Sequence, residues 1–427
     1  MIYEKLKTAA LTLLVLLSLL QSYMLAYSDP NPEPVTREEY VKTDQLGPQA
    51  KLEDLLFPDH LVLHLGNATH TVVYPNTKLY GQIVETVNQR WLEGFRKVSA
   101  SSLGINWDDV RMKQQGVEIH FRDGIPMKVL GEVMQLKGEI PADADLITRI
   151  WLYAKDANEV RTILFTDTTS TVYEVGKADF TVKDIERFVT VGEEYIPYKA
   201  TSGEIYLPLK PLNVSAYRMP FTQFSAEQLK RSFFVDPAIT RNLADRDGSE
   251  IYTDGKRGLQ LKTGQHWLTY SDPVVPVEGR IDVMENLTSA VQFVNQHGGW
   301  YGTYTVQRVP QRVLPVNQAF IFRQYYESFP VINQKSDQQG FIKLALQKGI
   351  VTNYERSTII PDLRAASRKD AQLAGGEALE EKLKEYSKRN TVYSVFPAYR
   401  MNVVDQAVEL VPAWTVELRD GSYEFME

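Results

Sequence analysis

Histidines are the first residues to consider for metal or nucleophilic chemistry, because the chain has six of them and no cysteine. His60 and His64 stand four residues apart in the stretch HLVLH, which reads as part of a strand. On a strand their rings share one face but lie roughly 13 Å apart, too far for one zinc ion. We therefore predict that these two, with His70, His120 and His266, are ordinary surface or half-buried residues.

The acidic stretch DRDGSEIYTDG is the second candidate for a metal site, in this case for calcium. An EF-hand loop needs oxygen ligands at alternate positions, a glycine at the sixth and a glutamate at the twelfth. Here Asp245 and Asp247 are followed at once by Gly248, and no glutamate stands at the twelfth position. Two hairpin turns, each at an Asp-Gly pair, explain the same residues. We predict no metal and no cofactor.

Catalytic motifs are a further possibility, and the sequence contains none of the common ones. It lacks G-x-S-x-G, H-E-x-x-H, S-x-x-K and a phosphate-binding glycine loop. Without cysteine it also has no thiol nucleophile and no disulfide. We predict that the protein is not an enzyme. Its 23 tyrosines leave open a cell-wall-polymer binding or sensing module, although sheet-rich domains use tyrosine freely.

The N-terminal segment predicts a membrane anchor. Residues 8–28 carry no charge, and as a helix they reach roughly 31 Å, about the thickness of the hydrocarbon core of a bilayer. Lys5 and Lys7 precede them, which favours a cytoplasmic N-terminus. We predict a cytoplasmic tail over 1–7, a transmembrane helix over 8–28, and a single-pass protein of the cell membrane with an extracytoplasmic body. A cleaved export signal is the alternative, but the residues around Ala26 form a poor cleavage site.

Three polar residues within this segment could mediate contact with partners. Ser18, Gln21 and Ser22 stand at i, i+3 and i+4 and so share one face of a helix. A glutamine in hydrocarbon is costly unless it meets a partner, and small polar residues at this spacing mediate helix contacts in membranes. We predict that the three residues contact transmembrane helices of partner proteins. The alternative is that Gln21 lies near the outer headgroups and is hydrated.

The body is predicted to be α+β, with a linker over 29–50 and three domains. The first domain, 51–195, combines several strands with one long helix, capped by Asn76 and carrying apolar residues as far as Phe95. The domains over 196–312 and 313–427 resemble each other, and each is predicted to be an antiparallel sheet covered by a helix. The predicted strands of the first domain are HLVLHL, HTVVYP, VEIHF, ITRIWLYA, VRTILFT and STVYEV.

The proposed duplication rests on two pairs of matching stretches. SFFV at 232–235 resembles SFPV at 328–331, and GLQLKTGQHWLTY at 258–270 resembles GFIKLALQKGIVTNY at 340–354. Each longer stretch reads as two strands that flank a glycine, and a helix follows in both copies. We predict that His297, just before Gly298-Gly299, helps to cap the C-terminus of the first of these helices.

The first copy carries about 14 extra residues near 236–249. A charged loop added to a duplicated scaffold is a place where a binding function can arise, so we predict a docking loop. A loop that merely packs is the alternative. The net charge of −7 is not clustered, which argues against nucleic-acid binding. The charged residues of the predicted docking loop are Asp236, Arg241, Asp245, Arg246 and Asp247.

Five stretches carry a resemblance to a known family: MIYEKLK before the apolar segment, SFFVDPAITRN, DGSEIYTDGKRGLQ, FVNQHGGW and LVPAWTVEL. Together they resemble the YycH (WalH) family of regulatory proteins of low-GC Gram-positive bacteria, over the whole chain and most densely over 232–300. The resemblance implies an anchored extracytoplasmic protein that acts with a smaller relative, YycI, on the sensor histidine kinase WalK (YycG) of the WalK/WalR (YycG/YycF) two-component system. That kinase governs cell-wall metabolism. The resemblance also implies three α+β domains, the last two alike, and leaves the direction of regulation open.

Overall fold

The computed structural model describes residues 2–27, 46–141, 145–168, 170–201, 205–244, 248–273, 282–308, 319–333, 339–347 and 349–426. The chain divides into two units, Met1–Thr43 and Asp44–Glu427. The first unit contains helix α1 (Ile2–Tyr27), and the second, called the body below, contains the other described elements. Within the described residues, no helix is both long enough and apolar enough to cross a membrane.

The first sheet of the body consists of ten described strands in the order β10-β9-β2-β1-β4-β6-β7-β8-β3-β5. The six strands predicted for the first domain are confirmed as β1, β2, β4, β6, β7 and β8, and β9 and β10 extend this sheet beyond residue 195. The strands are β1 (His60–Gly66), β2 (Thr69–Val73), β3 (Trp91–Ser99), β4 (Gln115–Pro126), β5 (Gln135–Lys137), β6 (Leu146–Ala154), β7 (Val160–Thr166), β8 (Thr171–Ala178), β9 (Tyr198–Ala200) and β10 (Tyr206–Pro208).

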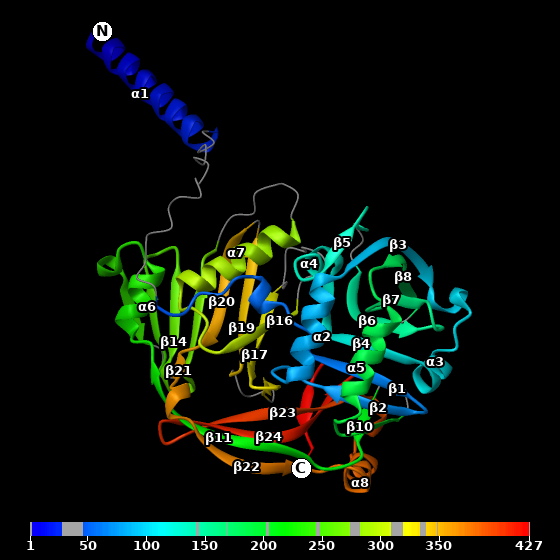
Figure 1. The fold of residues 1–427 in the computed structure, drawn as a ribbon. Coiled ribbons are helices and arrows are strands. Elements are labelled where there is room, and N and C mark those ends of the chain that lie inside the picture. Colours follow the sequence, from blue (N-terminus) through cyan, green and yellow to red (C-terminus); the bar gives the residue numbers. More distant parts are fainter. Residues whose placement is uncertain are drawn as a thin grey trace. The chain divides into compact units, whose positions relative to one another are not determined.

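Helices α2 (Lys78–Gln89) and α5 (Val182–Gly192) pack against each other, and α5 contacts β1, β4 and β6 (Figure 1). Leu79, Ile83 and Val87 form the buried stripe of α2 at three-to-four spacing. Short elements complete this part of the body: α3 (Trp107–Lys113), α4 (Met127–Leu130) and the 3-10 turns η1 (Glu53–Leu55) and η2 (Ala100–Leu103).

The predicted bounds of the long helix were wrong at both ends. Thr77, not Asn76, is the N-cap of α2, and its hydroxyl oxygen accepts a hydrogen bond from the Tyr80 amide. The helix stops at Gln89, and Phe95 lies in β3 opposite Val175 of β8. The sheet partner decided this boundary, because the apolar spacing alone also fits a longer helix.

A second network of fifteen described strands follows the order β12-β13-β14-β15-β20-β19-β17-β18-β23-β24-β11-β21, with β16 on β17, β22 on β11 and β25 on β24. The strands are β11 (Leu212–Gln223), β12 (Arg241–Ala244), β13 (Glu250–Thr253), β14 (Gly258–Lys262), β15 (Trp267–Ser271), β16 (Thr303–Arg308), β17 (Ala319–Tyr326), β18 (Phe329–Ile332), β19 (Phe341–Gln347), β20 (Ile350–Ser357), β21 (Ile359–Pro361), β22 (Ser367–Leu373), β23 (Val392–Val404), β24 (Ala407–Leu418) and β25 (Tyr423–Phe425).

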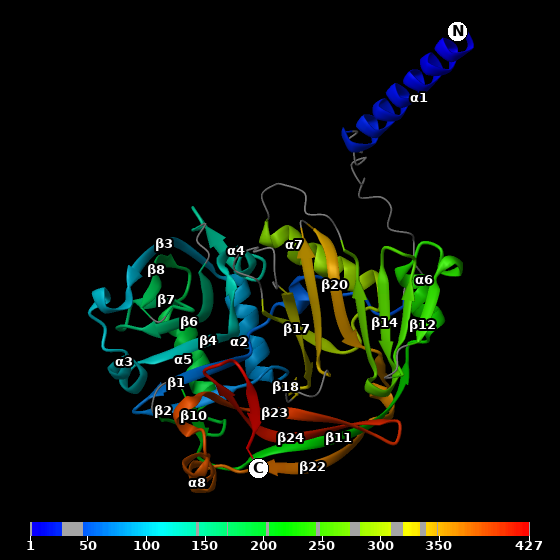
Figure 2. The same ribbon diagram turned by 180° about the vertical axis from the view of Figure 1, so that it is seen from behind.

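The two networks contain both strand directions, so the α+β class is confirmed but the purely antiparallel pairing is not. In the described residues β3 pairs with β5 in parallel, and β18 pairs with β23 in parallel. The β18–β23 pairing connects the strands under α7 to the layer of β23, β24, β11 and β22, which crosses below them in Figure 2. One parallel pairing therefore joins two antiparallel groups into one network.

Three helices accompany the second network: α6 (Ala226–Phe233), α7 (Val283–Gln296) and α8 (Glu377–Glu385). Helix α7 packs on β19 and β20, whereas Leu379 of α8 is buried in a separate cluster that includes Trp414. The 3-10 turns of this part are η3 (Pro237–Ile239), η4 (Thr263–Gln265), η5 (Leu363–Ala365) and η6 (Arg389–Thr391).

The two long matching stretches each form the expected strand pair, β14–β15 and β19–β20. They lie next to each other in one sheet, because β15 pairs with β20. The two short matching stretches differ in structure. Residues 232–235 include the end of α6, whereas residues 328–331 include the start of β18. β16 also pairs with β17 across residue 312. The strand pairings thus do not follow the predicted domain boundary there, and the three-domain division stays a prediction.

Residues 46–50, counted with the predicted linker, belong to the body. The amide of Ala50 donates to the side-chain oxygen of Asn295 at 3.0 Å, and the Trp300 amide donates to the Pro48 carbonyl at 2.8 Å. A β-carbon on Gly47 would lie 2.5 Å from the Gly298 carbonyl oxygen, so only glycine fits at this contact. The start of the body is therefore fixed against the C-terminal end of α7.

Candidate functional site

One face of the first sheet carries a buried row of polar side chains. Alternation along β1 places Leu61 and Leu63 in the main hydrophobic core and leaves His60 and His64 on the opposite face. The strand register puts His60 opposite His120. Glu118 stands two residues before His120 on β4 and therefore lies on the same face. This row, which we call the polar network, is made of Asp59, His60, His64, His70, Glu118, His120, Arg122 and Arg149.

Glu118 is the centre of one half of the polar network. Its carboxylate is fully buried and contacts His64 at 2.9 Å, His120 at 2.8 Å and Arg149 at 3.2 Å. Burial opposes its ionisation, but Arg149 and the hydrogen bonds from His120 and His64 hold the pKa of Glu118 well below its usual range. His64 also contacts His70, with 2.9 Å between their Nδ1 atoms. Glu118 is therefore a buried anion engaged on both of its oxygens.

Asp59 is the centre of the other half, and its partners come from both strand networks. The Arg122 guanidinium donates to it at 2.7 Å, His60 lies 2.8 Å away, and the Tyr325 hydroxyl donates to the same carboxylate. Burial disfavours the charge, but Arg122 and the hydrogen bonds from His60 and Tyr325 lower the pKa of Asp59 far below its ordinary value. Because Tyr325 belongs to β17, this contact ties the two networks together.

Arg122 makes a second link between the networks. Its guanidinium lies 3.6 Å from the centre of the Phe396 ring of β23 and 3.5 Å from the Glu417 carboxylate of β24. Burial raises the pKa of Glu417, whereas the neighbouring Arg122 acts in the opposite direction. A cavity of about 670 Å³ lies beside these residues and is also lined by His60, His120 and Arg149. This cavity therefore borders the Asp59, His60 and His120 side of the polar network.

The histidine predictions were wrong for His64 and His70, which are both fully buried. His60 and His120 are stacked, with 4.4 Å between ring centres. The stretch HLVLH indicates one strand only. The partners of His60 and His64 come from β2 and β4, so the spacing of the histidines within β1 could not predict this cluster of side chains. His297 is the C-cap of α7, as predicted, but it is also buried and bonded to Ser232 at 3.0 Å.

The arrangement favours a structural joint over a reaction centre. Asp59 and Glu118 each meet three hydrogen-bonding partners, which leaves neither carboxylate poised to take a proton from a substrate. In the described parts of the chain, no group of three or more metal-binding side chains could hold an ion.

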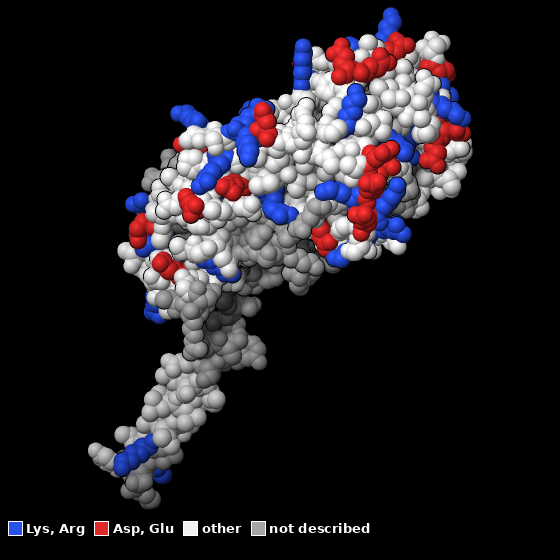
Figure 3. Space-filling view, turned by 90° about the horizontal axis from the view of Figure 1, so that it is seen from below, with Lys and Arg blue, Asp and Glu red and all other residues white. Residues whose placement is uncertain are grey.

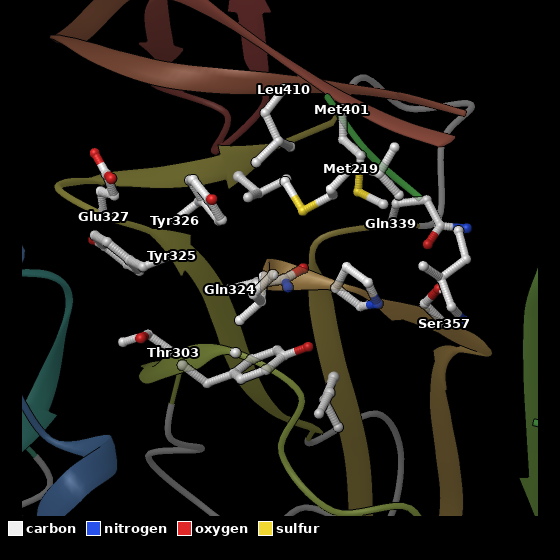
Figure 4. A pocket seen from close by; sticks show the side chains of 18 of the residues that line it. Met219, Thr303, Gln324, Tyr325, Tyr326, Glu327, Gln339, Ser357, Met401 and Leu410 are labelled. Atoms are coloured by element: carbon white, nitrogen blue, oxygen red, sulfur yellow. The ribbon is translucent and has the colours of Figure 1, made fainter. Parts of the chain in front are cut away.

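A second cavity, lined in part by Tyr325, lies where strands of the second network meet Phe57 and α2. It has a volume of about 480 Å³. Figure 4 shows Met219, Met401 and Leu410 on one side of it, with Gln324 and Thr303 on the other. Phe57 and Tyr80 line it from the side of the first sheet. We call it the central cavity.

The residues predicted for partner contact lie in two places. Ser18 and Gln21 are exposed on α1, and Ser22 belongs to the same helix although its side chain lies outside the described residues. In the predicted docking loop, the exposed Asp236 caps η3 by accepting from the Ala238 amide at 3.0 Å, and the exposed Arg241 begins β12. Asp245, Arg246 and Asp247 lie outside the described residues.

Comparisons with known proteins cover nearly the whole chain. Residues 4–191 match the family model of the YycH protein, N-terminal domain, and residues 202–425 match that of the YycH protein, C-terminal domain. A protein of Bacillus subtilis (strain 168), described as the two-component system WalR/WalK regulatory protein YycH, is 19% identical over 447 residues. The match covers 97% of this chain and 94% of that protein.

A solved structure shows the same fold. The crystal structure of YycH from Bacillus subtilis matches with a TM-score of 0.70 at 15% identity, over 91% of this chain and 99% of the solved one. The family resemblance inferred from the five sequence stretches is thereby confirmed.

Proposed function

The chain belongs to the YycH family, and on that premise we propose that it is a non-catalytic, membrane-anchored regulator of the sensor histidine kinase WalK. In this proposal the body lies outside the membrane and acts together with a YycI-type protein to tune the kinase that controls cell-wall metabolism. The observation that carries the proposal is the match along 97% of the chain to a protein described as a WalR/WalK regulatory protein.

The anchor in this proposal is α1. The segment over 8–28 is uncharged, and Leu13, Leu16 and Leu20 of the helix are more than half exposed. Exposed leucines of this kind need an apolar environment, which lipid and neighbouring transmembrane helices would supply. The lysines at 5 and 7 favour a cytoplasmic N-terminus.

Regulation in this proposal is a shift between two signalling arrangements of the kinase. A bound regulator shifts such an equilibrium only if it binds one arrangement more tightly than the other. The helix contacts near Ser18, Gln21 and Ser22 would supply part of this difference. The body, whose two strand networks are joined through Asp59 and Arg122, would supply a rigid extracytoplasmic contact surface.

The first test is a crosslinking pull-down from membranes, comparing the full-length protein with the body exported without residues 1–28. We expect WalK and the YycI-type protein to be recovered with the full-length form and to be reduced with the truncated form. Equal recovery would show that the helix is only a tether and that the body carries the contact. Recovery of neither protein with the full-length form would contradict the proposed function.

The polar stripe of α1 gives a sharper prediction. Changing Ser18, Gln21 and Ser22 to leucine removes possible interhelical hydrogen bonds, each worth about 0.6–2 kcal/mol, so recovery of partners should fall several-fold. Membrane fractionation checks that the variant still reaches the membrane. Leu13→Ile, Leu16→Ile and Leu20→Ile together form the matched control on the opposite face and should leave recovery unchanged. A normal level of recovery with the leucine variant would refute the stripe as a contact.

The docking loop stays part of the proposal as a second contact. Asp236→Lys with Arg241→Glu reverses two exposed charges while keeping the net charge of the loop. If the loop docks on a partner, crosslinking of the body to that partner should fall, because like charges would face each other. Unchanged crosslinking would identify the loop as a packing element only.

A further inference from the structure

The central cavity is the feature of the body that the proposed function leaves unexplained. Its volume of about 480 Å³ falls in the range that small-molecule sites occupy. Its walls come from distant parts of the chain: Met219 of β11, Tyr304 of β16, Met401 of β23 and Leu410 of β24. Met219, Tyr304 and Leu410 are buried within the protein. The cavity is therefore assembled only when these distant strands of the second network are packed together.

The lining of the central cavity is mainly apolar. Methionine, aliphatic and aromatic side chains make up most of the lining. Of the two charged lining residues, Glu327 is exposed at the edge and accepts from the Tyr217 hydroxyl at 2.6 Å. Arg356 is engaged elsewhere, since its guanidinium donates to the Gly299 carbonyl at 2.8 Å and to the Tyr354 hydroxyl at 3.1 Å. The lining therefore favours a ligand that is mainly apolar.

Gln339 adds one specific polar requirement. Its side chain is 7% exposed, and its amide nitrogen donates to the Gln265 carbonyl at 2.9 Å. Its amide oxygen is buried and has no hydrogen-bond partner among the residues that the structure describes. In Figure 4 this oxygen lies on the cavity side of the amide group. A buried acceptor without a donor is unfavourable, so a donor on a ligand would be matched to this position.

We propose that the central cavity binds an uncharged, mainly apolar small molecule that donates a hydrogen bond to Gln339. An alcohol with an aliphatic body has this chemistry. The apolar part would contact Met219, Met401 and Leu410, and the hydroxyl would lie at the Gln339 end. This inference does not depend on the proposed action on the kinase, because it rests on the cavity and its lining alone.

The test uses a photoreactive alcohol, 3-azioctanol, on the full-length protein in detergent, with adducts located by mass spectrometry. We expect adducts on cavity residues such as Met219, Met401 and Tyr326, and their suppression by excess 1-octanol. Adducts on α1 serve as an internal reference for general apolar partitioning. The matched probe without a hydroxyl, 3-azioctane, should label the cavity less than the alcohol relative to α1.

Two variants and one control complete the test. Gln339→Met keeps the side-chain size but removes the acceptor, and it should lower cavity labelling by the alcohol roughly three- to tenfold. Met401→Trp fills the cavity and should abolish labelling of Met219 and Tyr326. Gln82→Met, at an exposed position on α2, should change nothing.

Circular-dichroism melting shows whether each variant is folded. If Met401→Trp does not fold, the labelling of Gln339→Met decides the test by itself. Labelling confined to α1, or cavity labelling by the alcohol that is the same in Gln339→Met as in the parent protein, would overturn the proposal.

Discussion

At the scale of single residues, Arg122 and Asp59 join the two strand networks through buried charged groups. Arg122 reaches Asp59, Glu417 and the Phe396 ring, and Asp59 also accepts from Tyr325. Each group is buried and satisfied by the others, which is the condition under which a buried charge is tolerated. Removing one member would leave the rest as uncompensated charges.

This gives a prediction for Arg122→Met, which keeps the side-chain length but removes the charge. We expect a loss of roughly 3–5 kcal/mol in the free energy of unfolding, because Asp59 would remain buried without its cation. Urea unfolding followed by tryptophan fluorescence measures it. The matched control is Arg96→Met, whose side chain is 71% exposed beside Glu174 and which should cost at most about 1 kcal/mol. Equal losses for the two variants would contradict the role of the buried pair.

At the scale of elements, α5 shows how local sequence and packing agree. Thr181 and Asp184 form a capping box, in which the Thr181 hydroxyl oxygen accepts from the Asp184 amide at 3.2 Å and the Asp184 carboxylate accepts from the Thr181 amide at 3.0 Å. Ile185 and Phe188 face the core that α5 shares with β1 and β4. The cap sets where the helix starts, and the apolar stripe sets which side faces the sheet.

Thr181→Ala should therefore lower the free energy of unfolding by about 1 kcal/mol, because the Asp184 amide at the start of α5 loses its capping partner. Thermal and urea unfolding would both report the change. Thr69→Ala is the control, since the exposed Thr69 hydroxyl makes only a 3.5 Å contact with the Asn67 carbonyl. A neutral effect of Thr181→Ala would mean that tertiary packing alone sets the start of the helix.

At the scale of the whole molecule, the buried histidines make the body sensitive to acid. Burial lowers the pKa of His70, His120 and His297 to about 4 from an ordinary value of 6.5. The unfolded chain therefore takes up these protons at a higher pH than the folded chain does. On the face that Figure 3 displays, positive and negative side chains are interspersed.

The sign of the pH effect follows from these values. The contribution of these histidines to the free energy of unfolding is complete above pH 6.5. It is lost as the pH falls toward 4, by about 2 kcal/mol for each such histidine between pH 7.5 and pH 5. Urea unfolding at the two pH values measures this loss. His297→Gln, which removes one titrating group, should show a loss smaller by about 2 kcal/mol. A stability that is constant or rises between pH 7.5 and pH 5 would contradict the prediction.

Much of the element pattern was determined by the sequence itself. Short apolar stretches predicted β1 and β2 nearly to their ends, and the stretches with a central glycine predicted the pairs β14–β15 and β19–β20. These signals are local, since the period of a strand or a hairpin turn depends only on neighbouring residues. The family resemblance was also contained in short stretches of sequence. For the candidate site, the sequence singled out the four histidines of the polar network but not their partners.

The tertiary structure alone decided which elements meet. Nothing in residues 258–270 shows that β15 pairs with β20, and nothing near His64 shows that Glu118 and His70 surround it. The tertiary structure likewise decided that residues 46–50 attach to α7. It also decided that the central cavity is assembled from β11, β16, β23 and β24. Such contacts join residues far apart in the chain, so they depend on strand register and packing of the whole body and leave no periodic signal in the sequence.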